Sequence, residues 1–160
     1  MKYRSNNDTR AMARTTLALW LAAAAPLLGA TAPAHALEYR SLSEPSVLYD
    51  APSKQGKPLY VIARYTPVEI VIAVEGWAKV RDAEGAITWV ESRVLSAKRT
   101  LIATSRVEVR NQADGAAPLV FETDKGVVLE LIEAGPPGWV KVRHRDGQAG
   151  FVRVSQVWGL

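Results

Sequence analysis

The chain has 160 residues and a formal net charge of +4 at pH 7, with 20 lysine and arginine residues against 16 aspartate and glutamate residues. It contains no cysteine, which excludes a disulfide framework, a lipid attached through cysteine and catalysis by a thiol. Residues 1–36 hold four of the basic and one of the acidic side chains, so residues 37–160 carry 16 against 15, a net charge of +1. Because nonspecific binding of nucleic acid needs many cations, we expect no nucleic-acid partner.

The first 36 residues have the layout of a secretory signal peptide. Four basic residues lie within residues 1–14, and residues 15–34 carry no charge. The small-residue box Ala34-His35-Ala36 follows, and it predicts cleavage after Ala36. The alternative is an uncleaved membrane anchor, but two prolines interrupt the apolar run. We therefore expect a periplasmic or secreted protein with no stable membrane insertion of the mature chain.

The remaining chain contains one pattern twice. The segment WAKVR at residues 77–81 recurs 62 positions later as WVKVR at residues 139–143. Each copy is followed by an acid-glycine pair and then by an aromatic-valine pair. Self-similarity at a fixed spacing indicates two copies of one small β unit, and a repeated non-catalytic module is typical of recognition.

The repeat divides the chain into a first domain at 37–97, a short basic linker at 98–104 and a second domain at 105–160. About 60 residues is near the lower size at which a domain builds its own core. The linker has no run of Gly, Ser or Pro, so it is not typical of a flexible tether. We expect the two domains to pack against each other, with Leu101 and Ile102 buried between them.

Each copy has strand-like periodicity. Val68, Ile70 and Ile72 alternate with other residues in the first copy, as Leu129 and Leu131 do in the second. We expect a strand ending near residue 74 or 134, a strand from the repeated Trp, a hairpin at the acid-glycine pair, and a strand carrying the aromatic-valine pair. Short terminal strands would complete about five strands in each copy, enough for a small barrel. The fold class is therefore all-β. These terminal strands are Val47 to Tyr49 with Val94-Leu95, and Val107 to Val109 with Gln156-Val157.

Three segments of each copy carry a resemblance to a known family. They are residues 47–52, 76–80 and 89–95 in the first copy, and residues 107–111, 138–142 and 150–157 in the second. Each copy resembles a bacterial SH3-like (SH3b) domain, and the pair resembles exported tandem SH3-like proteins of the bacterial envelope. The resemblance implies two small SH3-like β-barrels in tandem. It also implies a non-catalytic binding module that recognises peptidoglycan, through either its stem peptide or its glycan.

The candidate ligand-binding residues are aromatic. Trp77 and Val80 are three residues apart on one strand, so if Val80 faces the core, Trp77 faces outward; the same holds for Trp139 in the second copy. The resemblance implies that these Trp residues bind ligand together with Tyr49, and that Tyr65 lies in a ligand-recognition loop. The alternative is that each Trp packs over the first loop or on the neighbouring domain.

Other positions separate this chain from eukaryotic SH3 domains that bind proline-rich peptides. Ala51 follows Asp50 where a further groove aromatic is expected, and the proline-groove position is Glu91 in one copy and Arg153 in the other. The sequence therefore does not favour a proline-rich ligand.

The remaining aromatic residues have structural explanations. We expect Trp89 and Phe151 to be core or hairpin packing residues, and Trp158 to cap an edge. Tyr60 and Phe121, like Tyr65, fall in the expected loops, where they are either loop anchors or part of a recognition surface.

We expect no enzyme and no cofactor or metal. His144 is the only histidine after residue 36, and it falls in a predicted hairpin turn, where we expect it to be solvated. The cations Lys98, Arg99 and Arg106 are interpreted as a solvated linker rather than as a phosphate or anionic-lipid site. Two functions stay open: recognition of a peptidoglycan fragment, or a protein-interaction or scaffold subunit that docks on a periplasmic envelope partner without binding the wall.

Overall fold

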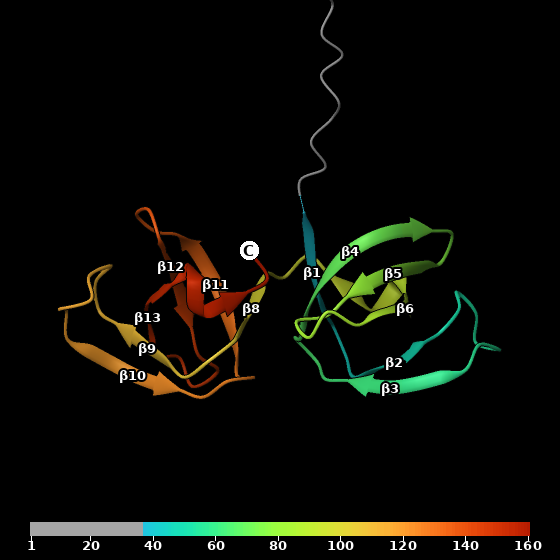
Figure 1. Ribbon diagram of the computed structural model, residues 1–160, viewed down its shortest axis with the longest axis horizontal. Helices are drawn as coiled ribbons and strands as arrows, with labels where there is room; N and C mark the ends of the chain where they lie inside the picture. The colour runs from blue at the N-terminus through green and yellow to red at the C-terminus, as the bar shows by residue number, and fades with distance from the viewer. Residues whose placement is uncertain (1–36) are drawn as a thin grey trace, which may run out of the picture. The chain divides into compact units, whose positions relative to one another are not determined.

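Fourteen β-strands and two short 3-10 helices, joined by turns and loops, lie within residues 37–160, the part of the chain that the computed structural model describes (Figure 1). The predicted signal peptide, with its cleavage residues Ala34 and Ala36, lies outside the described residues. Among residues 37–160, the structure has no helix with the length and apolar character needed to span a membrane.

The strands form two seven-stranded sheets with the same topology. The first sheet has the order β3-β2-β6-β5-β4-β1-β7, and all its neighbouring strands are antiparallel. A 3-10 turn, η1 (Ser92–Val94), leads from β6 to β7. The strands are β1 (Glu38–Leu42), β2 (Ser46–Tyr49), β3 (Pro58–Ile62), β4 (Pro67–Val74), β5 (Trp77–Arg81), β6 (Ile87–Glu91) and β7 (Leu95–Ser96).

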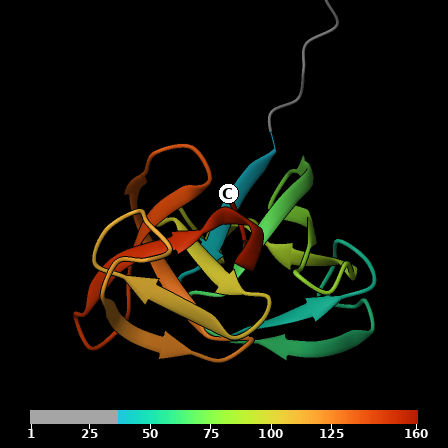
Figure 2. The ribbon, with the colours of Figure 1, turned by 60° about the vertical axis from the view of Figure 1, so that its left-hand side comes forward.

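The second sheet repeats this order as β10-β9-β13-β12-β11-β8-β14. Its 3-10 turn, η2 (Val154–Gln156), leads from β13 to β14. Each sheet curls on itself into a small barrel, and we call the two the first and the second barrel (Figure 2). The strands are β8 (Thr100–Ala103), β9 (Val107–Arg110), β10 (Leu119–Thr123), β11 (Val128–Ala134), β12 (Trp139–Arg143), β13 (Ala149–Arg153) and β14 (Val157–Trp158).

The repeated Trp strand forms the predicted hairpin in each barrel. Trp77 pairs with Glu91 across β5 and β6, and Trp139 pairs with Arg153 across β12 and β13. The turns contain Gly85 with φ of 89° and Gly147 with φ of 95°, a conformation that glycine adopts without steric cost. The acid-glycine pairs therefore fix the hairpins as the sequence predicts.

Alternate residues of the strands fill a separate apolar core in each barrel. The first core contains Val80 and Val90, and the second contains their counterparts Val142 and Val152, all almost fully buried. The side-chain period of two places the intervening residues on the outer faces of the strands. The repeated valines thus determine which residues of each hairpin remain available at the surface.

The predicted alternation breaks down in β4. Val68 is fully buried and Ile70 is half-buried, but Ile72 is 51% exposed. The pairing of β4 with β5 shifts register between Ile70 and Ile72, and β11 shifts at the matching place, between Leu131 and Glu133. A bulge adds one residue to one strand and so reverses the faces of the residues that follow it.

The linker prediction needs a correction. Residues 100–103 form β8, which pairs with β11 and β14 inside the second sheet. Leu101 is buried in the core of the second barrel rather than between domains, and Ile102 is only half-buried. The prediction of about five strands per copy was also too low, because β1, β3, β8 and β10 were not recognised.

Side chains and backbone link the two barrels. The Trp158 ring, at the edge of the second sheet, meets the Tyr39 ring of β1 edge to face, with 5.1 Å between centroids. The buried Thr100 hydroxyl donates a 2.7 Å hydrogen bond to the carbonyl oxygen of Tyr65. Ser41 Oγ donates to the carbonyl oxygen of Lys98 at 2.8 Å. These bonds satisfy buried polar groups, so they belong to the folded structure.

Candidate functional site

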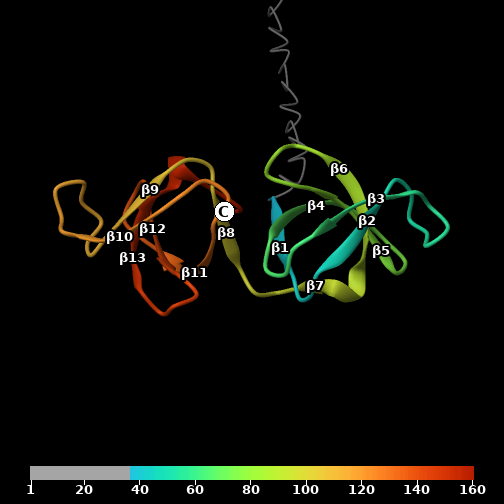
Figure 3. The same cartoon turned by 90° about the horizontal axis from the view of Figure 1, so that it is seen from below.

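A groove of about 270 Å³ opens on the first barrel. The β1–β2 loop, the β2–β3 loop and the end of β6 with η1 surround it. Val90 and Val94, both almost fully buried, line its base, and Tyr49 and Val47 line its side. The β2–β3 loop, which supplies Lys54, projects from the barrel (Figure 3). We call this cavity the charged groove, for the residues described next.

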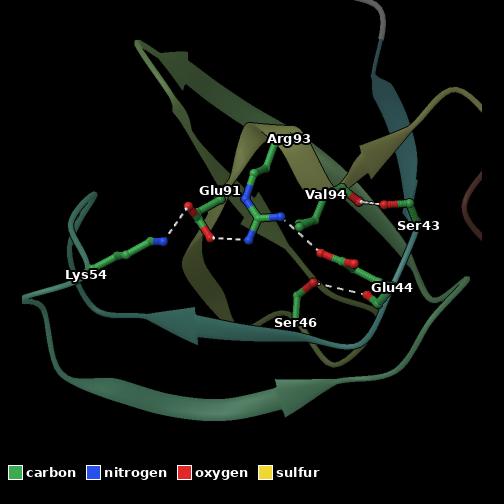
Figure 4. Close-up of polar contacts among 7 residues, drawn as sticks. All are labelled: Ser43, Glu44, Ser46, Lys54, Glu91, Arg93 and Val94. Atoms are coloured by element: carbon green, nitrogen blue, oxygen red, sulfur yellow. Dashed lines mark hydrogen bonds and ion pairs between the residues drawn. The ribbon is translucent and has the colours of Figure 1, made fainter.

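Four charged side chains of alternating sign cross the groove (Figure 4). Lys54 Nζ lies 3.3 Å from Glu91 Oε1, and Arg93 Nη2 lies 3.0 Å from Glu91 Oε2. Arg93 Nη1 in turn lies 3.1 Å from Glu44 Oε1. Two carboxylates and two cations are therefore presented together on one surface.

Hydrogen bonds to backbone carbonyl oxygens hold the segments that carry these charges. Ser43 donates to the carbonyl oxygen of Val94 through both its amide, at 2.8 Å, and its hydroxyl, at 3.0 Å. Ser46 Oγ donates to the carbonyl oxygen of Glu44 at 3.0 Å (Figure 4). These bonds tie the loop that carries Glu44 to the 3-10 turn that carries Arg93. The backbone therefore holds the two side chains close together.

The ion pairs act on the Glu91 carboxyl. The hydrogen bond from Arg93 is the main cause that holds the pKa of Glu91 below its usual range, and the bond from Lys54 acts in the same direction. Both interactions favour the charged form of the carboxyl. Glu91 is therefore an anion over the whole physiological range of pH.

One of the predicted ligand-binding residues lines this groove, and a second contacts that residue. Tyr49 lines it, and its ring meets the Trp77 ring edge to face, with centroids 5.5 Å apart and planes at 87°. Trp77 is half-buried while Val80 is fully buried, as expected if they point to opposite faces of β5. The two rings form an aromatic step beside the charged groove.

Trp139, the counterpart of Trp77, has a different environment. The guanidinium of Arg153 lies over its ring, 4.7 Å from the centroid. The cavity beside it measures only about 140 Å³ and is lined by Glu108, Arg110, Gly115, Trp139, Arg153 and Gln156. A cation on the indole face gives a favourable cation–π contact but also covers the surface that a ligand would use.

Tyr65 lies away from the charged groove and from the cavity beside Trp139. It sits in the turn between β3 and β4 with φ of 67°, the only non-glycine residue among residues 37–160 with positive φ. Arg64 lies 4.4 Å and Lys98 4.9 Å from the centroid of its ring. The four residues predicted to bind ligand thus occupy three separate places.

For Trp89 and Phe151 the structure agrees with hairpin packing and not with a place in the core, whereas the loop positions expected for Tyr60 and Phe121 are wrong. Trp89 and Phe151 are half-buried and belong to neither core; each lies near the lysine opposite it in the hairpin, Lys79 or Lys141, at 5.8 Å. They alternate with buried residues, so they face outward. Tyr60 and Phe121 lie in β3 and β10 rather than in loops.

Tyr60 is held by a carboxylate. Its hydroxyl donates a 2.8 Å hydrogen bond to Asp82 Oδ2. Burial first and this bond second raise the pKa of Tyr60 to about 12. Tyr60 is therefore neutral and fixed in place at physiological pH.

His144 is half-buried in the β12–β13 hairpin rather than fully solvated. Its Nδ1 lies 3.0 Å from Asp146 Oδ2, and its ring lies 5.7 Å from that of Phe121. Within residues 37–160, no three His, Cys, Asp or Glu side chains cluster closely enough to hold a metal ion.

The sequence predicts Tyr49 and Trp77 as candidate residues but does not point to the charged residues of the groove. Glu44, Lys54 and Arg93 come from loops and a 3-10 turn, where periodicity carries no information on direction. Glu91 was noticed only as a departure from the proline-groove pattern. That departure is the available signal, because an acid at the groove position favours nearby cations over a proline-rich ligand.

Comparisons with known proteins place the chain in a family. A search of curated proteins gave no match. Among solved structures, NlpC2 from Trichomonas vaginalis is similar at 12% identity and a TM-score of 0.36, over 77% of this chain and 48% of that one. An NLPC/P60 family protein from Bacillus cereus ATCC 10987 is similar at 12% identity and a TM-score of 0.36, and the match covers 76% of this chain and 56% of that one. The chain spans about half the length of these proteins.

The family model described as bacterial SH3 domain matches the chain twice, at residues 43–97 and 103–159. Each match lies within one of the two barrels, and together they confirm the tandem arrangement and the all-β fold. This chain therefore belongs to the bacterial SH3 domain family.

Proposed function

We propose that this chain is an exported, non-catalytic binding protein of the bacterial envelope, and that the charged groove of the first barrel recognises the stem peptide of peptidoglycan. The observation that carries the proposal is the row of four alternating charges beside Tyr49 and Trp77. The layout of residues 1–36 supports export.

The charges of the groove complement those of a stem peptide. A short peptide with free carboxylates and a diamino acid can pair its carboxylates with Arg93 and Lys54, and its ammonium group with Glu44 and Glu91. The side chains of Lys54 and Arg93 are 64% and 65% exposed, so their present ion pairs are weak and exchange at little cost. A neutral glycan would use the aromatic step but not these charges.

Cosedimentation of residues 37–160 with purified sacculi tests the proposal. We expect retention, and we expect Trp77→Ala to abolish it because the aromatic step is lost. Trp139→Ala is the matched control: its indole is already covered by Arg153, so retention should stay near that of the original chain. Equal loss in both variants, or no retention of the original chain, contradicts the proposed site.

A second experiment separates stem peptide from glycan. A soluble stem peptide added to the sacculus assay should compete for the protein, whereas glycan strands stripped of peptide should not. Arg93→Gln should weaken retention, because it removes the cation that joins both carboxylates of the groove. Competition by the stripped glycan would assign the groove to sugar.

One observation favours the protein-docking alternative. Strand β3 lies at an edge of the first sheet and exposes Leu59, Tyr60 and Val61, the last to 65%. Apolar edge strands pair readily with a strand from another protein. A chain that fails to bind sacculi, and whose complex with an envelope protein is broken by Val61→Lys, would support this function instead.

A further inference from the structure

A second, basic pocket lies apart from the charged groove. Two adjoining cavities of about 260 and 330 Å³ share Tyr65, Val128, His144 and Arg145 in their walls. Arg64 enters from the first barrel, Lys98 from the segment before β8, and Arg143 from the end of β12. The pocket therefore depends on residues of both barrels.

Four cations line this basic pocket and one carboxylate opposes them. Lys98 Nζ lies 3.4 Å from Glu130 Oε1. Among residues 37–160, no carboxylate oxygen lies within 4.0 Å of the guanidinium nitrogens of Arg64, Arg143 or Arg145. The three arginines thus leave a local excess of positive charge.

The nearby Asp146 does not neutralise these arginines through direct contact. It accepts hydrogen bonds from the amide and side chain of Gln148, at 3.0 and 2.9 Å, and pairs with His144 at 3.0 Å. Its carboxylate is thus committed to its own hairpin turn.

Tyr65 is held rigidly at the wall of the pocket. Its amide donates to the carbonyl oxygen of Leu42 at 2.8 Å, and its carbonyl oxygen accepts the hydrogen bond from Thr100. These two bonds maintain a positive φ that a tyrosine rarely adopts. Such strain persists only where the surroundings impose it, and it is concentrated at ligand clamps and active sites.

The chemistry of the walls selects the class of ligand. Guanidinium groups are planar, weakly hydrated donors that match phosphate oxygens in pairs. A single carboxylate would balance one of the three arginines, whereas a phosphate monoester carries a charge of roughly −1.5 to −2 at pH 7. Val127, Val128 and the Tyr65 ring provide an apolar surface for the body that carries the phosphate.

We propose that this basic pocket binds the phosphate group of a second ligand, separate from the ligand of the charged groove. The phosphate can belong to a soluble phosphorylated compound or to a lipid headgroup, since both present the same group to Arg64, Arg143 and Arg145. A nucleic-acid polymer fits less well, because residues 37–160 carry a net charge of only +1.

Titration of residues 37–160 with pyrophosphate at constant ionic strength, followed by NMR, tests the pocket itself. Saturable shifts are expected at the amides of Tyr65 and of residues 143–147. Arg143→Gln/Arg145→Gln should weaken binding at least tenfold, and Arg64→Gln alone should weaken it less. Lys57→Gln/Lys79→Gln removes the same charge away from the pocket and should leave binding unchanged. Uniform shifts, or equal loss in the control, would overturn the site.

Vesicle flotation then distinguishes the two sources of phosphate. Vesicles of phosphatidylcholine are compared with vesicles that also contain phosphatidylglycerol. Flotation only with phosphatidylglycerol, lost in Arg143→Gln/Arg145→Gln but not in Lys57→Gln/Lys79→Gln, assigns the pocket to a lipid headgroup. Saturable pyrophosphate binding without flotation assigns it to a soluble compound. Failure of both probes overturns the proposal, whether or not the chain binds sacculi.

Discussion

The two barrels have the same strand order and the same pairing register, yet their grooves differ, among other positions, at three that the strands and the 3-10 turns match. Tyr49 of the first barrel corresponds to Arg110 of the second, since they pair with Trp89 and Phe151 respectively. Glu91 corresponds to Arg153, and Arg93 corresponds to Ser155 in the second 3-10 turn.

One of these changes covers the aromatic surface of the second groove, which is also the smaller of the two. Arg153 lies over Trp139, and Arg110 Nη1 turns away to donate a 2.8 Å hydrogen bond to the carbonyl oxygen of Ala117. In the first barrel the acid Glu91 has no attraction for the negative face of an indole, so it pairs with cations and leaves Trp77 against Tyr49. The sign of one charge opposite the Trp thus determines whether the aromatic surface is covered.

The comparison shows that different residues determine the fold and the groove. The buried valines at matched positions keep both barrels alike, whereas the outward positions between them contribute little to either core. Outward residues can therefore change in one copy without loss of the barrel. We infer that the groove proposed to bind peptidoglycan belongs to the first barrel alone.

The largest expected effect is on stability, at a matched buried position where the two barrels carry different residues. Thr88 of β6 and Gly150 of β13 occupy matched positions, but a Cβ on Gly150 would lie 2.4 Å from the carbonyl oxygen of Arg110. Backbone must move to admit it, so Gly150→Thr should lower the free energy of unfolding by about 3 kcal/mol or more. Urea unfolding followed by circular dichroism measures the change.

The reverse exchange is the matched control. Thr88→Gly removes a side chain without a clash and should cost about 1 kcal/mol, the usual effect of glycine in a strand. If Gly150→Thr is as mild as Thr88→Gly, the close approach of β13 to β9 does not distinguish the barrels.

The next largest effect is expected from a substitution that covers Trp77 in the first barrel. Glu91→Arg gives the first barrel the cation that covers Trp139 in the second, and it places like charges beside Lys54 and Arg93. Binding to sacculi should weaken roughly tenfold or more, equivalent to about 1.4 kcal/mol. The free energy of unfolding should change by less than about 0.5 kcal/mol because the site is at the surface. Unchanged retention with an intact fold would show that the groove does not bind.

A smaller gain is expected from opening the second groove. Arg110→Tyr/Arg153→Glu restores the two groove residues of the first barrel around Trp139. The second site would still lack the counterparts of Glu44, Lys54 and Arg93, so we expect a few-fold increase in retention through avidity rather than a full second site. Arg153→Gln alone serves as the control for simple removal of the cation. A gain that persists when Trp77→Ala is added would show that the new site binds independently.

The sequence carried enough information for the barrels because the repeat marks equivalent strands and turns. The Trp strands, the glycines of the hairpins and the alternating valines all lie where the pattern predicts. Strands β3 and β10 were missed because their side chains are largely exposed or half-buried, so no alternation of apolar residues marks them. Strand β8 was missed because Thr100 is polar and buried.

The groove could be predicted only in part, for a physical reason. Tyr49 and Trp77 lie on strands whose faces follow from the period of two. Glu44, Lys54 and Arg93 lie in loops and a 3-10 turn, where direction depends on tertiary hydrogen bonds such as that from Ser43 to Val94. Similarly, no local sequence pattern predicts that Arg64 and Arg145 line the same cavity, because they come from different barrels.

The smallest expected effect is on the pKa values of two carboxyls, one in each barrel. Hydrogen bonds from the amide and side chain of Gln148 are the main causes that lower the pKa of Asp146 to about 2, whereas the side chain of Arg93 is the main cause that lowers the pKa of Glu91. Arg93→Gln should therefore raise the pKa of Glu91, and His144→Gln should leave the pKa of Asp146 well below its usual range. A carboxyl-detected NMR titration measures both.

Linkage gives the sign of the effect on stability. Both folded pKa values are lower than the unfolded ones, so each charged carboxylate stabilises the fold at neutral pH, and this contribution is lost as pH falls through the folded pKa. Removing Arg93 raises the pKa of Glu91, so its contribution becomes smaller and disappears at a higher pH. Roughly 0.5 M salt should raise the pKa of Glu91 more than that of Asp146, because screening weakens an exposed ion pair more than a hydrogen bond within a turn. Equal sensitivity of the two carboxyls to salt would show that the groove charges are held as firmly as a hairpin, and that a peptide could not readily displace them.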